Sequence, residues 1–427
     1  MNRDEVTKEL TLGGFDDALI TLYGDDEETL AAQRKRYIRA IKSFETIYPE
    51  SEDISIFSAP GRTEICGNHT DHQHGCVLAA AIDLDAIAIV SFHNDHVIRL
   101  QSVGYEQEFI ELDHLGIQPE EKGTSTALVR GMVSQFHDMG IEVGGFNAFI
   151  TSDVLSGSGL SSSAAFEVLI GNIIDRHYNH GRAGAVKIAK MGQFAENKYF
   201  GKESGLMDQM VSSVGGFVFI DFEDTTDPKI EKHQCDFDKG GLKLIITDTK
   251  GSHADLTDDY VSVPSEMKLI AAQFGKTVLR EVEEEQFYHS LPHLRTVCSD
   301  RAILRAAHFY GDNARVGKEV EALDKKDFET FLNLVRESGR SSAELLQNLY
   351  STKKPVEQGI PLALMVSKRL LGHDGAFRVH GGGFAGTIQA FVPVDRIEEY
   401  KTTMEELFEE GCCYLLNIRS EGGYQVI

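Results

Sequence analysis

A glycine- and serine-rich turn, Gly157-Ser-Gly-Leu-Ser-Ser-Ser-Ala-Ala165, opens directly onto a stretch whose apolar residues have helical spacing. A turn that leads into a helix N-terminus presents free backbone N–H groups and the positive end of the helix dipole, and together these bind anions. Hydroxyl groups in the same turn can reach a phosphate or its Mg²⁺. The chain contains no G-x-x-x-x-G-K-[ST] string, so the pattern predicts a phosphate-binding loop that lacks the Walker lysine.

Two further segments, one on either side of this turn, belong to the same argument. They are Ala59-Pro-Gly-Arg-Thr-Glu-Ile-Cys-Gly-Asn-His-Thr-Asp71 and His380-Gly-Gly-Gly-Phe-Ala-Gly386. In order and spacing the three segments resemble the motifs of the GHMP small-molecule kinases, and within them those of the galactokinases. The first resembles the galactokinase sugar-binding signature, the second the ATP-phosphate loop and the third the C-terminal glycine-rich loop. The resemblance runs from about Phe57 to the C-terminus.

Composition limits the partners that the chain can have. The formal net charge is −25, which argues against nucleic acid or an anionic membrane as the main partner. No apolar run approaches the roughly 18 residues that a membrane span needs, and the charged N-terminus leads into no signal-peptide core. We therefore expect a cytoplasmic protein without a membrane partner, with free cysteine thiols. The sequence leaves the oligomeric state open, and a monomer is the default expectation.

The length of 427 residues is enough for two domains, each with its own core. We expect a polar N-terminal segment over residues 1–50 with one amphipathic helix, in which Arg34-Lys-Arg36 forms a solvated face. An N-terminal domain over residues 51–240 would carry the sugar signature and the phosphate loop, and a C-terminal domain over residues 241–427 the glycine-rich loop. The resemblance implies an α+β, two-domain GHMP-kinase-like architecture with the active site in the interdomain cleft.

Hydrophobic patterning predicts the elements around these motifs. Residues 82–90 and 96–100 alternate as in a hairpin with a turn at Asn94-Asp95. A strand at 146–150 should feed the Gly157 turn, and helices are expected at 161–177 and 183–200. Further strands are expected at 217–222 and 242–247. A last strand at 387–392 should follow the glycine-rich loop.

Asp208 is the candidate catalytic base, within Gly205-Leu-Met-Asp-Gln209. A carboxylate in so apolar a setting needs a partner, because an ionised group resists burial. The residues alone leave a catalytic role and a helix-capping role equally open. The segment resembles the galactokinase Gly-x-Met-Asp-Gln motif, which implies that Asp208 is the catalytic aspartate and that Arg62 is its cationic partner.

The resemblance also implies how ATP and Mg²⁺ are bound. Taken alone, Glu196 is typical of an exposed helix carboxylate. The family pattern makes it a Mg²⁺ ligand together with a hydroxyl of Ser162 or Ser163, a donor set that suits an octahedral oxygen site. The residues expected to cradle the phosphates are Gly157, Ser158, Gly159, Leu160, Ser161, Ser162, Ser163 and Ala164.

The sugar pocket implied by the resemblance would be formed by Asn68, His69, Asp71, Gly205 and Tyr260, with Gly381, Gly382 and Gly383 as a supporting loop. Asp71 can accept two hydroxyl protons at once. Tyr260 is the least secure assignment, because the arginines that usually follow that tyrosine are missing. The histidines of His69-Thr-Asp-His-Gln-His74 have no second ligand group nearby, which argues against a zinc site.

Asn68 departs from the galactokinase pattern, in which a glutamate at this position receives the C6 hydroxyl of the sugar. An amide removes one charge and adds two donors, so it would no longer repel a carboxylate at C6. The string His69-Thr-Asp-His-Gln73 also resembles that of galacturonate kinases. Galactose is the first expectation as substrate, giving galactose 1-phosphate, and galacturonate or another C6-modified galacto-sugar is the alternative.

A non-catalytic sugar sensor is an alternative of another class. Some galactokinase-like proteins bind ATP and galactose without phosphorylation, having lost residues of the phosphate loop. Here Ser163-Ala164-Ala165 is present, and Arg62, Glu196 and Asp208 are retained. These residues favour a working enzyme over a sensor.

Overall fold

The computed structural model describes residues 1–154, 159–251 and 256–427. Its helices are α1 Arg3–Leu12, α2 Asp16–Tyr23, α3 Glu27–Ile47, α4 Ser125–Asp138, α5 Ser162–Tyr178, α6 Ala185–Phe194, α7 Met207–Val214, α8 Thr257–Ala272, α9 Glu284–His289, α10 Leu291–Val297, α11 Asp300–Asp324, α12 Phe328–Ser341, α13 Gly359–Leu371 and α14 Ile397–Phe408. Its strands are β1 Ser55–Cys66, β2 Cys76–His93, β3 Val97–Ser102, β4 Glu108–Glu111, β5 Gly145–Ser152, β6 Phe217–Asp221, β7 Lys229–His233, β8 Leu242–Asp248, β9 Ala376–Val379, β10 Thr387–Pro393, β11 Cys413–Leu416 and β12 Tyr424–Gln425. The α+β prediction is confirmed.

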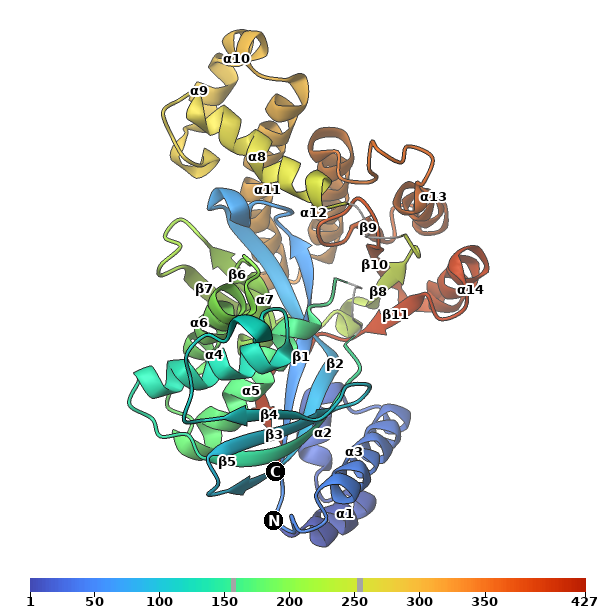
Figure 1. The fold of residues 1–427 in the computed structure, drawn as a ribbon. Helices are drawn as coiled ribbons and strands as arrows, with labels where there is room; N and C mark the ends of the chain where they lie inside the picture. The colour runs from blue at the N-terminus through green and yellow to red at the C-terminus, as the bar shows by residue number, and fades with distance from the viewer. Residues whose placement is uncertain (155–158, 252–255) are drawn as a thin grey trace.

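The larger sheet is built around β2, which pairs with β1, β5 and β6 along its length. Its strand order is β12-β1-β2-β5-β3-β4, with β6 and β7 extending from β2. Ile87 and Ile89 face the helices of the N-terminal segment, whereas Ala88 and Val90 belong to the core on the opposite face. Because helices cover both faces, β2 reads as a nearly continuous apolar run (Figure 1).

The hairpin expected from residues 82–90 and 96–100 is wrong. Both segments are strands, but β5 lies between them, antiparallel to β2 and parallel to β3. β3 forms its antiparallel pair with β4 instead. The chain does reverse its direction at Asn94-Asp95. However, β2 and β3 both pair with β5, which begins about 50 residues later in the sequence.

The N-terminal segment contains three helices rather than the one expected. Its apolar side chains, among them Tyr37 and Phe44, pack on Ile56, Ile87 and Phe149 of the larger sheet. The expectation of a solvated basic face is wrong for Arg36, which is only 7% exposed and pairs with the buried Asp85.

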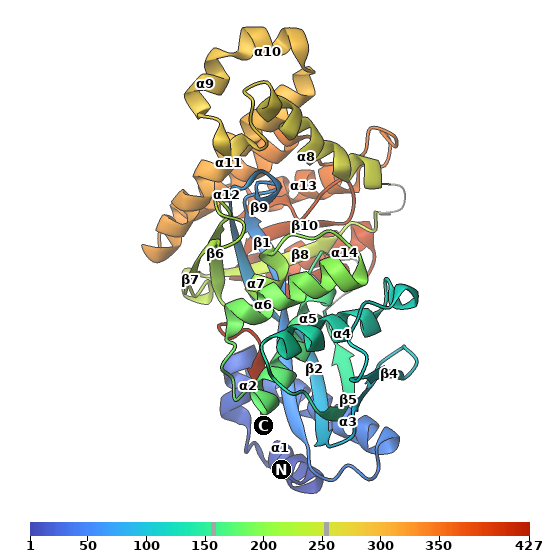
Figure 2. The same ribbon diagram turned by 60° about the vertical axis from the view of Figure 1, so that its left-hand side comes forward.

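The smaller sheet has the order β11-β8-β10-β9. Helices α13 and α14 pack on one face through Ile360 and Tyr400, and α12 packs on the other through Phe331. The strand at 387–393 is not the last, because β11 and β12 follow it. β12 pairs with β1, so the chain ends beside the N-terminus in the larger sheet (Figure 2). The domain limits at residues 50 and 240 remain a prediction.

Helices α8, α9 and α10 form the end of the molecule that is farthest from both termini (Figures 1 and 2). Across the described ranges, no helix combines the length and the apolar character required to cross a membrane. The six cysteines are free thiols, as expected.

Candidate active site

Arg62 and Asp208 form the ion pair that the sequence motifs suggested. β1 carries Arg62, and Asp208 lies in the first turn of α7. The Nε and Nη2 atoms of Arg62 are both 2.8 Å from Asp208 Oδ1. The Ser161 hydroxyl donates to the other carboxylate oxygen, and Arg62 Nη1 donates to the carbonyl of Gly159. The Arg62 guanidinium and the Ser161 hydroxyl therefore fix the orientation of the Asp208 carboxylate. Ser161 directly precedes α5, so the carboxylate lies where α5 and α7 begin.

The turn before α5 is shaped by an unusual backbone at Ser161, whose φ of 62° is left-handed. Leu160 is buried, and its carbonyl accepts the N–H of Arg62 at 3.0 Å, which ties the turn to β1. Ser162 and Ser163 then occupy the first positions of α5, with Ala164 packed beneath them. Gly157 and Ser158, also expected to cradle phosphate, lie outside the described residues.

Glu196 lies in a π-helical turn, Ala195–Phe200, that continues α6, and its side chain is buried. Its Oε1 is 3.5 Å from the Ser163 hydroxyl and 2.8 Å from Lys202 Nζ. Gln209 Nε2 donates to the other oxygen at 2.9 Å. Of the two candidate serines, Ser163 is thus the one whose hydroxyl bonds Glu196.

The sequence did not single out Lys202, Gln209 or Glu167 as neighbours of this site. Gln209 also donates to Glu167 Oε2 at 2.9 Å, so one amide bridges two carboxyl groups. Burial and the nearby charge of Glu196 raise the pKa of Glu167 well above its usual value. One sequence feature could have indicated that Glu167 lies near the site. It follows the phosphate loop by one helical turn, on the buried side of α5.

Asp71 and Gly205 are adjacent, as expected for one pocket. A Cβ atom at Gly205 would lie 3.1 Å from Asp71 Oδ2, so glycine keeps the carboxylate uncovered. Asp71 Oδ1 accepts the backbone N–H of His72 at 2.9 Å, which fixes the orientation of the carboxylate.

The glycine-rich loop joins His69 and Tyr260. His69 Nε2 is 3.1 Å from the Gly382 carbonyl, and burial lowers the pKa of this histidine to about 4, which leaves a neutral ring that donates. The Tyr260 hydroxyl donates to the Gly383 carbonyl at 3.0 Å, and its ring leaves no room for a Cβ at Gly382. Gly381 and Gly383 have positive φ, so the conformation of the loop favours glycine.

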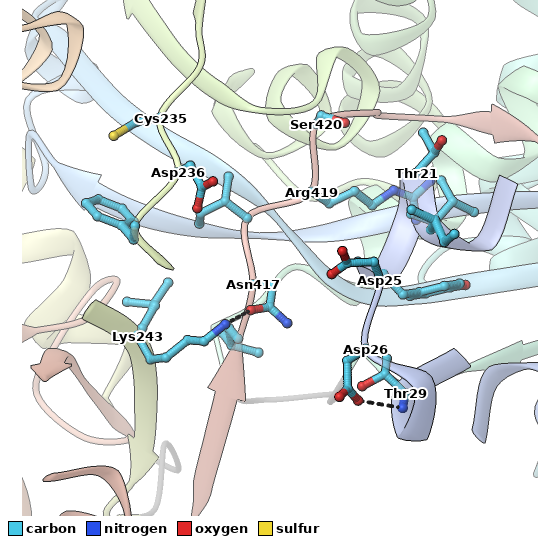
Figure 3. A pocket seen from close by; sticks show the side chains of 18 of the residues that line it. Thr21, Asp25, Asp26, Thr29, Cys235, Asp236, Lys243, Asn417, Arg419 and Ser420 are labelled. Atoms are coloured by element: carbon cyan, nitrogen blue, oxygen red, sulfur yellow. Dashed lines mark hydrogen bonds between the residues drawn. The ribbon is translucent and has the colours of Figure 1, made fainter. Parts of the chain in front are cut away.

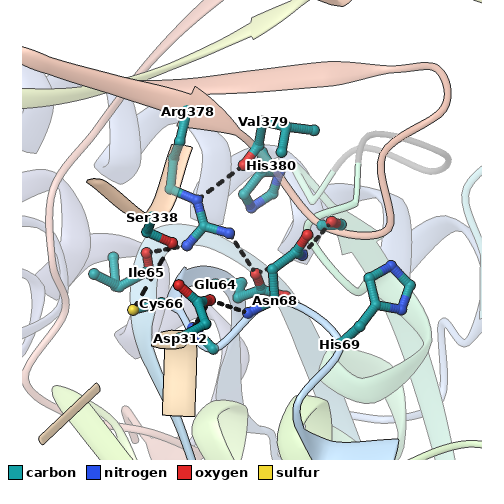
Figure 4. Close-up of polar contacts among 12 residues, drawn as sticks. Glu64, Ile65, Cys66, Asn68, His69, Asp312, Ser338, Arg378, Val379 and His380 are labelled. Carbon is teal, nitrogen blue, oxygen red and sulfur yellow. Dashed lines mark hydrogen bonds and ion pairs between the residues drawn. The ribbon is translucent and has the colours of Figure 1, made fainter. Parts of the chain in front are cut away.

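Asn68 lies behind this loop rather than on an open surface. Its side chain donates to Glu64, which lies beside it in Figure 4, and to the Gly381 carbonyl, and it is only 1% exposed. The two donors that the amide adds are therefore both used within the protein.

A cavity lies beside the N-terminus of α5, between α4, α5 and the strands β3 and β5. Its lining includes Ser162, Ser163, Phe166, Tyr105 and Phe200. The walls of this cavity therefore contain both hydroxyl groups and aromatic rings.

A second cavity, between the N-terminal segment and β8, contains none of the predicted site residues (Figure 3). Its polar groups contact one another: Lys243 donates to Asn417 at 2.6 Å, and Asp26 caps the N-terminus of α3 through the N–H of Thr29.

Among the described residues, no three His, Cys, Asp or Glu side chains come together so that they could hold a metal ion. A cation at Glu196 would therefore depend on the Ser163 hydroxyl and on oxygens of a bound ligand.

Two family models match the chain. The galactokinase galactose-binding signature matches residues 42–92, and the GHMP kinases N-terminal domain matches residues 127–216. These matches contain the first two motifs identified above, and they confirm the resemblance to the GHMP kinases that those motifs suggested.

Solved structures share the fold over most of the chain. Galactokinase from Lactococcus lactis, complexed with galactose, aligns with a TM-score of 0.75 at 22% identity, over 90% of this chain and 98% of that one. A D-glycero-D-manno-heptose 1-phosphate kinase from Bacteriodes thetaiotaomicron aligns with a TM-score of 0.59 at 17% identity, over 87% and 98%. Streptococcus pneumoniae phosphomevalonate kinase, in complex with phosphomevalonate and AMPPNP, aligns with a TM-score of 0.56 at 13% identity, over 87% and 99%.

Proposed function

The chain carries the GHMP kinase N-terminal domain together with the galactokinase galactose-binding signature, and on this premise we propose that it is an ATP-dependent sugar kinase acting on galactose. The reaction transfers the γ-phosphoryl group of ATP to the anomeric C1 hydroxyl. An O1–P bond forms, the bond to the β-phosphate breaks, and galactose 1-phosphate and ADP leave. The galactose in the Lactococcus lactis structure and the AMPPNP in the phosphomevalonate kinase structure support these two ligand classes.

The observation that carries the proposal is the Arg62–Asp208 pair between the N-termini of α5 and α7. Asp208 Oδ2 accepts the sugar proton as O1 attacks, and Arg62 offsets the negative charge that develops there. Ser161 donates to this same oxygen before the substrate arrives, so the sugar hydroxyl takes the place of the serine hydroxyl. The backbone N–H groups at the start of α5 face the phosphates, since a helix N-terminus favours anions.

Glu196 and Ser163 fit a magnesium ion, because one carboxylate and one hydroxyl leave the remaining octahedral positions to phosphate oxygens and water. Mg²⁺ would neutralise phosphate charge when bound. Gln209 holds Oε2 of Glu196, and Oε1, which the largely exposed Lys202 contacts, would be the oxygen offered to the cation.

The cavity beside α5 suits the purine of ATP. It adjoins Ser162 and Ser163, and its aromatic walls, Tyr105, Phe166 and Phe200, offer stacking surface at one end of the phosphate site. Ligand sites combine apolar walls with a few polar groups in this way.

The test is ADP release with Mg·ATP and a panel of galactose, galacturonate, N-acetylgalactosamine, glucose and talose. We expect galactose to turn over fastest. Turnover of another panel sugar at a higher kcat/KM would reject galactose as the substrate. Binding of galactose and ATP without ADP would reject the enzyme in favour of the sugar sensor.

A further inference from the structure

His380 is a buried histidine at the neck of the glycine-rich loop, and it has no place in the mechanism proposed above. It follows Val379, the last residue of β9 (Figure 4), and is only 3% exposed. Its backbone N–H donates to the Thr387 carbonyl at 3.1 Å, and its Nδ1 is 3.0 Å from the Thr387 hydroxyl. Because Thr387 begins β10, His380 joins the two ends of the glycine-rich loop.

The other ring nitrogen of His380 reaches β1, where Nε2 is 3.1 Å from the Thr63 hydroxyl. Gln389 Nε2 donates to this hydroxyl at 2.8 Å and to the Glu64 carbonyl at 2.9 Å, and the carbonyl fixes which end of the Gln389 amide is the nitrogen. Within the described ranges the Thr63 hydroxyl has these two partners only, so it accepts from Gln389 and donates to His380 Nε2. The proton of a neutral ring must then lie on Nδ1, which donates to Thr387.

The surroundings of the ring keep it neutral. Burial and the positive charges of Arg62 and Arg378 lower the pKa of His380 to about 3. The ring therefore carries a single proton over the whole physiological pH range. The order of donors and acceptors from Gln389 through Thr63 to His380 is consistent with that neutral state.

The ring also lies against the phosphate loop. A Cβ atom at Gly159 would be 3.5 Å from both Cε1 and Nδ1 of His380 and 3.9 Å from the Thr387 hydroxyl, so the space above the two side chains is that of one methyl group. The Gly159 carbonyl accepts from Arg62 Nη1, while Nε and Nη2 of Arg62 contact Asp208. A displacement of His380 would therefore shift an acceptor that orients Arg62 against Asp208.

We propose that His380 is a positioning residue that ties the neck of the glycine-rich loop to β1 and to the phosphate loop. Through these contacts it holds Arg62 against Asp208. The inference rests on the proposed sugar-kinase function, in which this ion pair acts on the acceptor hydroxyl. It adds a connection that neither loop has alone, because the loop beside the sugar and the loop beside the phosphates cannot shift independently.

Two substitutions test the role in the full chain. Thr63→Val keeps the shape of the side chain and removes only the hydroxyl that donates to Nε2, and His380→Phe keeps a planar ring but loses both hydrogen bonds. We expect kcat for ADP release to fall at least about tenfold in each variant, since a displacement of about an ångström can cost about 10²-fold in rate. The calorimetric dissociation constant for galactose should stay within about threefold. The double variant should lose little more than His380→Phe alone, because both substitutions break the same connection.

Thr247→Val is the matched control, because Thr247 is also a buried strand threonine with a hydrogen-bonded hydroxyl, 3.5 Å from Cys413 Sγ. Urea unfolding should show similar losses of stability in the two valine variants, whereas kcat should fall only in Thr63→Val. A Thr63→Val protein with the kcat of the wild type, or an equal loss of kcat in the control, would overturn the positioning role.

¹⁵N NMR of the histidine rings in the wild-type protein tests the hydrogen bonds without requiring turnover, with His380→Phe to assign the signal. We expect a neutral ring protonated on Nδ1 from pH 5 to pH 8, although the pKa of an unperturbed histidine is about 6.5. A ring that titrates in this range, or one protonated on Nε2, would overturn the inference. A wild-type protein that forms no ADP while its His380 shows the expected ring would reject the proposed kinase and support the hydrogen bonds inferred here.

Discussion

The pairing of Asp208 with Arg62 gives the sharpest prediction for a single side chain. Asp208→Ala removes the group that we propose accepts the sugar proton, and general base catalysis is typically worth about 10² to 10⁴ in rate. We expect kcat to fall at least about 10²-fold while galactose affinity changes much less. Steady-state ADP release and calorimetric binding measure the two quantities, with Asp227→Ala, an exposed aspartate, as control. Activity within tenfold of wild type would reject Asp208 as the base.

Glu319 gives a prediction about pH and stability. It is fully buried on α11, and burial raises the pKa of its carboxyl to about 8, although Arg378 opposes the shift. The folded state therefore binds this proton more tightly than the unfolded state. The resulting stability is complete below the unfolded pKa, near 4.5, and is lost as pH rises through 8.

Glu319→Gln should abolish this dependence, because the amide stays neutral at every pH. We expect the variant to gain on the order of a few kcal/mol over wild type between pH 5 and pH 9, measured by urea unfolding of both proteins. The other titrating groups contribute equally to both proteins, so their contributions cancel when the two free energies of unfolding are subtracted. A stability difference that is the same at both pH values would contradict the assignment.

The sequence predicted the motif residues better than their neighbours. Arg62 and Asp208 could be named because short motifs contain them, whereas Ser162 and Ser163 stayed alternatives and Glu196 followed from the family resemblance alone. The partners that hold them, such as Lys202 and Gln209, come from turns and helices whose approach depends on the tertiary fold. Asn68 could be identified as a departure from the pattern, but its burial follows from Asn348 and Gly381, which are about 300 residues away in the chain.

The positions of helices and strands with strong hydrophobic periodicity could be predicted from the sequence. The pairing of the strands could not. The strands at 146–150 and 387–392 and the helix at 161–177 lie close to β5, β10 and α5. The hairpin failed because β5 inserts between β2 and β3, and a local turn signal carries no information on such an insertion.

The loop between β9 and β10 supplies a steric prediction. A Cβ atom at Gly383 would lie 2.1 Å from the Asn348 carbonyl oxygen, so Gly383→Ala must displace the loop from Tyr260. We expect kcat/KM for galactose to fall at least about tenfold, as is common when a support of an active site shifts by about an ångström.

Gly372→Ala is the control for backbone strain alone, since Gly372 also has positive φ but no atom within 4 Å of the position that an alanine Cβ would occupy. It should lose stability alone, because its φ of 54° and ψ of −117° suit only glycine, with kcat/KM near that of wild type. An equal loss of activity in both variants would mean that the position of the loop does not matter.

Asp85 connects three parts of the chain that are far apart in the sequence: the N-terminal helices, β2 and the C-terminal segment. This fully buried carboxylate on β2 binds Arg36 of α3 at 2.6 Å and Arg419, near the C-terminus, at 3.1 Å. Tyr23 of α2 donates to it at 2.6 Å. Although burial opposes ionisation, the two arginines hold the pKa of Asp85 below its usual value. The N-terminal segment is thus part of the larger sheet's core, and its removal should prevent folding.

Asp85→Asn keeps the shape of the side chain but leaves the buried Arg419 without a counter-charge and Arg36 with only the half-exposed Asp153. Breaking a buried pair by removal of one partner costs about 3–5 kcal/mol, whereas exposed pairs contribute about 0–1 kcal/mol. We therefore expect a large drop in the urea midpoint for Asp85→Asn and almost none for Asp374→Asn, whose carboxylate is 65% exposed beside Arg396. Similar midpoints for the two variants would show that the N-terminal segment is held by its apolar contacts alone, because the ion pair would then contribute no more than a surface pair does.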